Sequence, residues 1–275
     1  MTFRVSTALL GWAFLLSAQS DWNEPYDPHR IADNLYYVGS KGLSTYLITT
    51  PQGHILINSS FDQTVPIIRQ NVEKLGFQFK DVKILLTSHA HGDHVAGNAL
   101  VKELTGAQVY VMQGDEDVVR TGGEGQYLYK GGWKPCKVDK VLKDGEKVTL
   151  GGITLVAVHT PGHTRGCTTW TMKAKDKGKT YDVVIVGSPN VNPGYQLVKN
   201  AIYPEIAADF ARSFKVWKSL PCDIFLGAHG VYYNMEEKVK RLSADGPNPF
   251  IDPKGYQAYI ADRERHYRST LEKQK

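Results

Sequence analysis

The stretch Val82-Lys83-Ile84-Leu85-Leu86-Thr87-Ser88-His89-Ala90-His91-Gly92-Asp93-His94 joins an apolar run directly to four side chains that can bind a metal ion. A continuous apolar run of this length is typical of a strand that is buried on both faces. The residues from His94 to Leu104 have a helical pattern, which Gly106 ends. Sites in α/β sheets usually lie at the carboxyl ends of strands. The stretch therefore predicts a strand, a short ligand-bearing loop and a helix.

The four side chains of this loop favour a metal site over scattered surface or core histidines. Three imidazoles and one carboxylate, packed together after a buried strand, would repel and desolvate one another without a cation. His89 and His91 alternate along an extended loop and can face one metal, whereas the helix start turns Asp93 and His94 in another direction. For the histidines outside such a cluster we expect surface or satisfied core positions: His29, His54, His159 and His266.

Two further histidines follow later strands and complete the ligand set. His163 stands in Pro161-Gly162-His163-Thr164, and His229 stands in Gly227-Ala228-His229-Gly230. Both lie beside small residues, which let other groups approach closely. The predicted ligands are His89, His91 and His163 for one zinc ion and Asp93, His94 and His229 for a second.

Such a pair of sites predicts hydrolysis by a metal-bound hydroxide. Two zinc ions about 3.5–4 Å apart can share a hydroxide, and zinc lowers the pKa of its bound water to about 7. The hydroxide would attack a carbonyl while zinc stabilises the developing oxyanion. Asp93 is the candidate catalytic residue, because it would orient the hydroxide as well as bind metal.

Along the rest of the chain the apolar residues change repeatedly between a period of two and a period of 3.6. Expected strands cover residues 35–38, 46–49, 54–58, 82–86, 109–112, 138–142, 147–150, 153–159, 168–172, 183–186 and 224–226. Expected helices cover residues 64–75, 94–104, 115–120, 205–220 and 253–272. This pattern predicts two packed sheets with helices outside, within a single domain over residues 21–275. The glycine-rich stretch 121–135 is either a loop over a cleft or a plain connection.

The first twenty residues have the pattern of a secretory signal peptide. Arg4 precedes a short apolar run from Ala8 to Leu16, and small residues follow before an expected cleavage near Ser20. The alternative is an uncleaved anchor, but the run is too short to span a bilayer. We therefore expect a signal peptide over residues 1–20 and a periplasmic or secreted mature protein, with no membrane attachment after cleavage.

Charge and cysteine content narrow the range of partners. The formal net charge is +5 and no run of five or six like charges occurs, which argues against a nucleic-acid partner. A monomer that acts on a small molecule is favoured. Because there are three cysteines, at least one thiol has no intramolecular partner. A disulfide between Cys136 and Cys167 is possible, and the sequence does not decide whether it forms.

The string His-Ala-His-Gly-Asp-His resembles the signature of the metallo-β-lactamase superfamily. The downstream blocks Thr160–Gly166 and Gly227–Gly230 resemble that superfamily in order and spacing. The resemblance extends from about Leu35 to the last predicted helix. It implies an α/β fold, the four-layer αββα metallo-β-lactamase sandwich, with the site at the edge of the two sheets.

Within that superfamily the chain resembles the third subclass (B3) of class B β-lactamases. Glyoxalase II, lactonases and tRNA-processing nucleases carry a metal-bridging Asp where this chain reads Val186-Gly187-Ser188-Pro189-Asn190, which has no carboxylate. The first subclass has a zinc-binding Cys in this region, and this chain has none there. The second subclass begins its motif with Asn, where this chain has His89. The blocks Pro193–Leu197 and Leu220–Asp223 also resemble the third subclass.

The resemblance implies hydrolysis of the β-lactam amide bond in penicillins, cephalosporins and carbapenems, which gives antibiotic resistance. It also implies two zinc ions per chain, bound by the six ligands named above. The alternative is another exported dizinc hydrolase that acts on lactones, thioesters or phosphoesters. A non-enzymatic zinc module is a third hypothesis, but six ligands divided between two metals leave open coordination positions.

Three positions depart from the pattern of the relatives. Pro189 and Val191 stand where the third subclass often has two hydroxyl residues that contact the substrate carboxylate. Ser188 and Asn190 are the candidate substrate-binding substitutes, although a purely structural turn explains them equally well. Asn58 stands where the superfamily commonly has an Asp that orients a ligand from behind.

Overall fold

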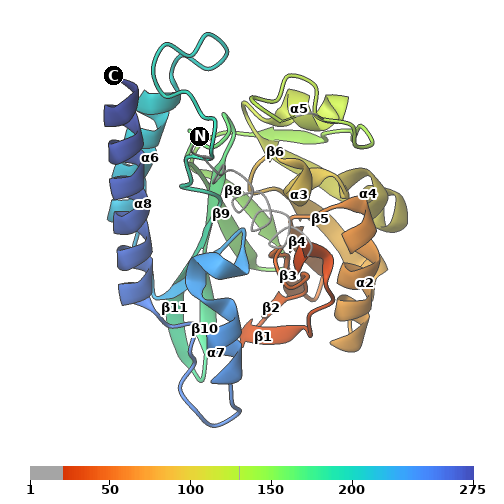
Figure 1. Ribbon diagram of the computed structural model, residues 1–275. Coiled ribbons are helices and arrows are strands. Elements are labelled where there is room, and N and C mark those ends of the chain that lie inside the picture. The colour runs from red at the N-terminus through yellow and green to blue at the C-terminus, as the bar shows by residue number, and fades with distance from the viewer. Residues whose placement is uncertain (1–20, 130) are drawn as a thin grey trace, which may run out of the picture.

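The computed structural model describes residues 21–129 and 131–275 (Figure 1). The expected signal peptide over residues 1–20 lies outside these residues. Among the helices that are described, none combines the length and the apolar character needed to cross a membrane.

Alternating apolar side chains give the first sheet two buried faces. In β4 (Gly53–Ile57), Ile55 and Ile57 belong to the core between the two sheets, whereas Leu56 belongs to a second core under the helices. The neighbouring strand β5 (Val82–Leu86) alternates in the same way. This double burial explains the consecutive apolar residues Ile84, Leu85 and Leu86, whereas Lys83 in the same strand is exposed.

The two sheets have seven and five strands in the described residues. The first sheet has the order β1 (His29–Ala32), β2 (Leu35–Tyr37), β3 (Tyr46–Thr50), β4, β5, β6 (Gln108–Met112) and β7 (Lys140–Leu142). Pairing is antiparallel from β1 to β4 and parallel from β4 to β7. The second sheet has the order β12 (Ile224–Gly227), β11 (Lys179–Val186), β10 (Thr168–Asp176), β9 (Ile153–His159) and β8 (Glu146–Leu150). In this sheet the β11–β12 pair is parallel and the other pairs are antiparallel.

Helices cover the outer face of each sheet (Figure 1). The helices outside the first sheet are α2 (Val65–Lys74), α3 (Gly92–Val95), α4 (Asn98–Thr105) and α5 (Glu116–Thr121). The helices outside the second sheet are α6 (Ile206–Ser219) and α8 (Pro253–Gln274). A short helix, α7 (Met235–Lys240), follows the loop after β12. These four layers confirm the predicted αββα sandwich.

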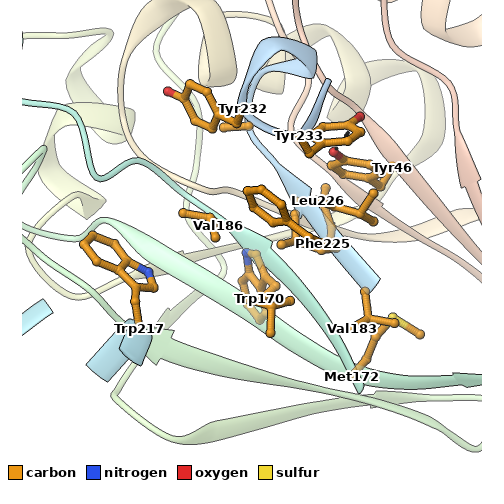
Figure 2. Close-up of a cluster of buried hydrophobic side chains, with 14 of the residues drawn as sticks. Tyr46, Trp170, Met172, Val183, Val186, Trp217, Phe225, Leu226, Tyr232 and Tyr233 are labelled. Atoms are coloured by element: carbon orange, nitrogen blue, oxygen red, sulfur yellow. Dashed lines mark hydrogen bonds between the residues drawn. The ribbon is translucent and has the colours of Figure 1, made fainter. Parts of the chain in front are cut away.

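Large side chains fill the space between the sheets, and polar bonds fix the edge from which the site is built. Figure 2 shows Tyr46 of the first sheet beside Tyr233, which follows β12, and the two hydroxyl groups lie 3.2 Å apart. The Tyr46 hydroxyl donates to the main-chain oxygen of Gly227 (2.7 Å). The indole of Trp170 in β10 donates to the main-chain oxygen of Thr87 (3.0 Å), just before the ligand loop. The two sheets are therefore tied together at the ends of β5 and β12.

The expected helix over residues 94–104 is wrong in one respect, because it is divided into α3 and α4. At Gly97, between them, a Cβ atom would lie 2.8 Å from the main-chain oxygen of Ser59 and 2.6 Å from a methyl group of Val65. The chain changes direction there to pass this contact. The Cys136–Cys167 disulfide that the sequence left open is absent, since within the described residues all three cysteines are free thiols.

Candidate metal centre

Three loops at one edge of the two sheets bring the six predicted ligands together. One loop follows β5 and continues into α3, the second follows β9, and the third follows β12. In chain order the ligands on these loops are His89, His91, Asp93, His94, His163 and His229. The remaining histidines belong to neither group of potential ligands within the described residues: His29, His54, His159 and His266.

His89, His91 and His163 form the first group. Their ligand atoms lie within 4.8 Å of one another, and all three residues are buried. The imidazole Nδ1–H of His163 donates to the main-chain oxygen of Asn190 (2.7 Å). This bond leaves Nε2 with its lone pair free for a metal.

Asp93, His94 and His229 form the second group, and their spacing fits a zinc ion. The Oδ2 atom of Asp93 lies 3.1 Å from His94 Nε2 and 3.5 Å from His229 Nε2, and the two nitrogens are 3.2 Å apart. Ligands about 2.1 Å from a tetrahedral zinc are separated by about 3.4 Å. The Nδ1–H of His229 donates to the main-chain oxygen of Gly42 (3.1 Å), which again frees Nε2. His89 also lies within 4.8 Å of Asp93 and His94, so the two groups are adjacent.

The electrostatics of the site favour the neutral form of His89, His91, His163 and His229 and the charged form of Asp93. Burial, together with neighbouring imidazoles, lowers the pKa of His91 to about 4 and that of His229 to about 4. The same causes hold the pKa values of His89 and His163 well below their usual range. Burial alone would raise the pKa of Asp93, but the facing imidazoles of His94 and His229 hold it below its ordinary value. The group therefore offers unprotonated ligands near neutral pH.

Local backbone geometry places His163. Gly162 has a positive φ of 127°, and a Cβ atom there would lie 2.7 Å from the ring of Phe210. Both the conformation and the space exclude other residues. The glycine before His163 thus lets the loop between β9 and β10 pack closely against Phe210 of α6.

A cavity of about 870 Å³ opens above both groups. Aromatic side chains form part of its wall: the Tyr129 ring lies 4.8 Å from the His91 ring, and the Trp22 ring lies 5.4 Å from the His229 ring. Trp133 also lines it, so the glycine-rich stretch expected as a loop borders a cleft. Binding sites for small molecules have volumes of about 300–1,000 Å³.

The two candidate substrate-binding residues lie in different surroundings. Ser188 is fully buried, with its hydroxyl 3.2 Å from the Tyr232 hydroxyl, and it does not line the cavity. Asn190 does line it, and its Nδ2 donates to the same Tyr232 hydroxyl (2.9 Å). The Oδ1 atom of Asn190 has no hydrogen-bond partner among the described residues.

Sequence reasoning missed two residues that shape the site. Trp22 forms a wall although it lies 67 positions before the first ligand, and a lone aromatic gives no signal of such a role. Asp115 is a buried carboxylate that accepts hydrogen bonds from residues 90, 164 and 166. The available signal was an Asp at the junction of a predicted strand and a predicted helix, which an ordinary helix start also explains.

The sequence profile described as the metallo-β-lactamase superfamily matches residues 41–176. The FEZ-1 metallo-β-lactamase from Legionella gormanii is 51% identical, with a TM-score of 0.90, over 92% of this chain and 98% of that chain. The chain belongs to the metallo-β-lactamase superfamily. The predicted family and fold are thereby confirmed, and membership supports the expectation of a hydrolase.

Further relatives show where in the superfamily the likeness lies. The class B3 di-zinc metallo-β-lactamase LRA-12 from an Alaskan soil metagenome is 34% identical, with a TM-score of 0.87, over 98% of both chains. Uncharacterized curated proteins of Mycobacterium bovis and Mycobacterium tuberculosis are 32% identical over 111 residues, which is 38% of this chain. The chain matches about half the length of these curated relatives (49%).

Proposed function

We propose that this protein is a zinc-dependent β-lactamase that opens the four-membered lactam ring of penicillins, cephalosporins and carbapenems. The observation that carries the proposal is the triangle of Asp93, His94 and His229, whose edges of 3.1–3.5 Å fit one tetrahedral zinc ion beside a second buried group of three imidazoles. The similarity to FEZ-1 and LRA-12, both metallo-β-lactamases, supports the substrate class.

The proposed ligands divide between two zinc ions per chain. They are His89, His91 and His163 for the first ion, and Asp93, His94 and His229 for the second. Zinc bound there would supply Lewis-acid activation of the lactam carbonyl and of the attacking water. In the overall reaction the water oxygen bonds to the carbonyl carbon, the C–N bond breaks, and a proton passes to the ring nitrogen.

The protein's own side chains orient the reactants. Asp93 is the proposed catalytic residue: its low pKa keeps it ionised, so that it holds the attacking water by accepting a hydrogen bond from it. Tyr129 beside His91 and Trp22 beside His229 would exclude bulk water from the cavity. Asn190 is the proposed substrate contact, whereas the buried Ser188 would act through Tyr232.

A spectrophotometric assay of the hydrolysis of a carbapenem and of a penicillin tests the proposal. We expect purified protein with zinc to hydrolyse both, to lose this activity in a chelator and to regain it on addition of zinc. Elemental analysis of the same sample measures the bound metal. Zinc-loaded protein that turns over neither compound, but hydrolyses a lactone, thioester or phosphoester, would establish the alternative hydrolase instead.

We also propose that residues 21–275 act as one exported domain. The loops that carry the ligands follow strands of both sheets, and these ligands meet in a single site. If the two sheets were separate domains, this site would be divided between them. Cleavage near Ser20 would leave Trp22 in the mature chain, where it lines the cavity. Fractionation of cells that express the full chain, with N-terminal sequencing of the exported product, tests both points. A product that keeps residues 1–20 at the membrane would contradict the export proposal.

A further inference from the structure

We propose that Asp115 is a positioning residue that sets the strength of the first metal site by tying its two ligand loops to one carboxylate. The inference rests on the proposed metal site but not on the identity of the substrate. Asp115 lies between β6 and α5, and it is only 2% exposed. It is not itself a member of either group of potential ligands.

The carboxylate contacts both ligand loops of the first site. Its Oδ2 atom accepts from the main-chain N–H of Ala90 (2.8 Å), which stands between His89 and His91. The same oxygen accepts from the Thr164 hydroxyl (2.7 Å), next to His163. Its Oδ1 atom accepts from the main-chain N–H of Gly166 (2.8 Å). One oxygen thus joins the loop after β5 to the loop after β9.

Close packing leaves this connection no room to shift. A Cβ atom on Gly166 would lie 2.6 Å from the Asp115 Cβ and 2.7 Å from its main-chain nitrogen. A Cβ atom on Gly114 would lie 2.9 Å from the main-chain carbon of Arg165. The backbone before α5 therefore lies directly against the loop that carries His163.

Burying the charged carboxylate of Asp115 costs free energy, because the group loses its hydration. Burial raises the pKa of Asp115, against the hydrogen bonds from Thr164, Gly166 and Ala90. A carboxylate nevertheless meets a requirement that an amide does not, because all three partners are donors and both of its oxygens only accept. In the Asp115→Asn variant the side-chain NH₂ group would face a donor in either orientation, so one loop would be released.

The test is the zinc affinity of the first site, measured by competition with a chromophoric chelator. The His229→Ala background disables the second site, so that one affinity is read. Asp115→Asn should weaken zinc binding about 10–100-fold, as expected for a residue that supports a ligand from behind. The control is Asp139→Asn, which removes an exposed carboxylate before β7 that accepts from the main-chain N–H of Val109 (2.9 Å) and pairs with Lys102 and Lys137.

A merely structural role makes a different prediction. It lowers the melting temperatures of metal-free and zinc-loaded protein equally, whereas a positioning role shrinks the rise in melting temperature on zinc binding. If Asp115→Asn weakens zinc binding no more than Asp139→Asn does, the proposal is wrong. Should Asp115→Asn fail to fold, Thr164→Val and Thr164→Ser decide: loss with Val and rescue by Ser support it, and equal affinities overturn it.

These measurements are independent of the catalytic activity. If the protein binds zinc but hydrolyses no β-lactam, the proposed function is wrong. The role of Asp115 is then still decided by the zinc affinity of the Asp115→Asn variant. A wild-type protein that binds no zinc would overturn both.

Discussion

The side-chain amide of Asn58 faces the imidazole of His94, with Asn58 Nδ2 lying 3.4 Å from His94 Nδ1. The amide orientation is fixed from both ends. Its Oδ1 accepts from the main-chain N–H of Ser88 (2.8 Å), and its Nδ2 donates to the main-chain oxygen of Ser44 (3.3 Å). Because His94 Nε2 points at Asp93 and His229, a metal on Nε2 requires the proton on Nδ1. Two donors then face each other behind the second site.

We predict that Asn58→Asp strengthens zinc binding at the second site about tenfold. A carboxylate would accept from both the Nδ1–H of His94 and the main-chain N–H of Ser88, at the cost of the long bond to Ser44. The positive φ of 66° at this position is one that Asp tolerates as Asn does. Chelator competition on the two-zinc protein measures the change. As a control, the substitution should leave affinity unaltered in the His229→Ala background, and an unchanged second site would contradict the interpretation.

Asp93→Asn should reduce bound zinc from two ions to one and lower kcat for β-lactam hydrolysis by about 100-fold or more. The amide loses the charge that holds the cation and can present a donor to His94 Nε2, 3.1 Å from the present Oδ2. Elemental analysis and steady-state kinetics check the two effects separately. Asp62→Asn, at an exposed carboxylate, is the control and should change neither. Full activity with one zinc would remove Asp93 from the catalytic role.

Tyr129→Ala should raise KM several-fold more than it lowers kcat, because the ring forms a cavity wall against His91 without supplying a ligand. Tyr129→Phe separates the ring from the hydroxyl, which accepts from Asn192 Nδ2 (2.8 Å). If the aromatic ring is what matters, the KM of Tyr129→Phe should lie close to the wild-type value. A Phe variant as impaired as Ala would assign the effect to the hydrogen bond with Asn192.

The metal-free protein should lose stability as the pH falls from about 7 toward 4. His91 and His229 have folded-state pKa values of about 4, below the ordinary value of 6.5. Between these values the unfolded chain binds more protons than the folded chain, so protonation favours unfolding and stability rises with pH. Melting temperatures of chelator-treated protein across this range measure the effect. The slope should decrease in a His91→Ala/His229→Ala variant, and an unchanged slope would place the titration elsewhere.

The sequence predicted the elements whose burial repeats regularly and missed those fixed by tertiary contacts. The strand over residues 82–86 was found from its apolar run, and the helix near residues 205–220 was found because its apolar residues follow the helical period. The short strand β1 and the short helix α7 carry too few residues to show a period. The division between α3 and α4 depends on contacts of Gly97 with Ser59 and Val65, which no local pattern contains.

The same distinction holds for the site. The cluster from His89 to His94 is visible because four ligand types stand within six residues. Trp22, by contrast, reaches the cavity through contacts with distant chain: its main-chain oxygen accepts a hydrogen bond from Ser40, and its side chain packs on Gly42. Only the folded chain brings these residues beside His229.

The bond from Tyr46 to Gly227 joins positions 181 residues apart, and His94 meets His229 across 135 residues. Contacts this distant in sequence form late, since long loops must close before they contribute any stability. The second cation can thus be captured only after almost the whole polypeptide has emerged and both sheets have docked. Uptake of the second ion would then mark the completion of folding rather than its start, and products that end before His229 would be left without that ion.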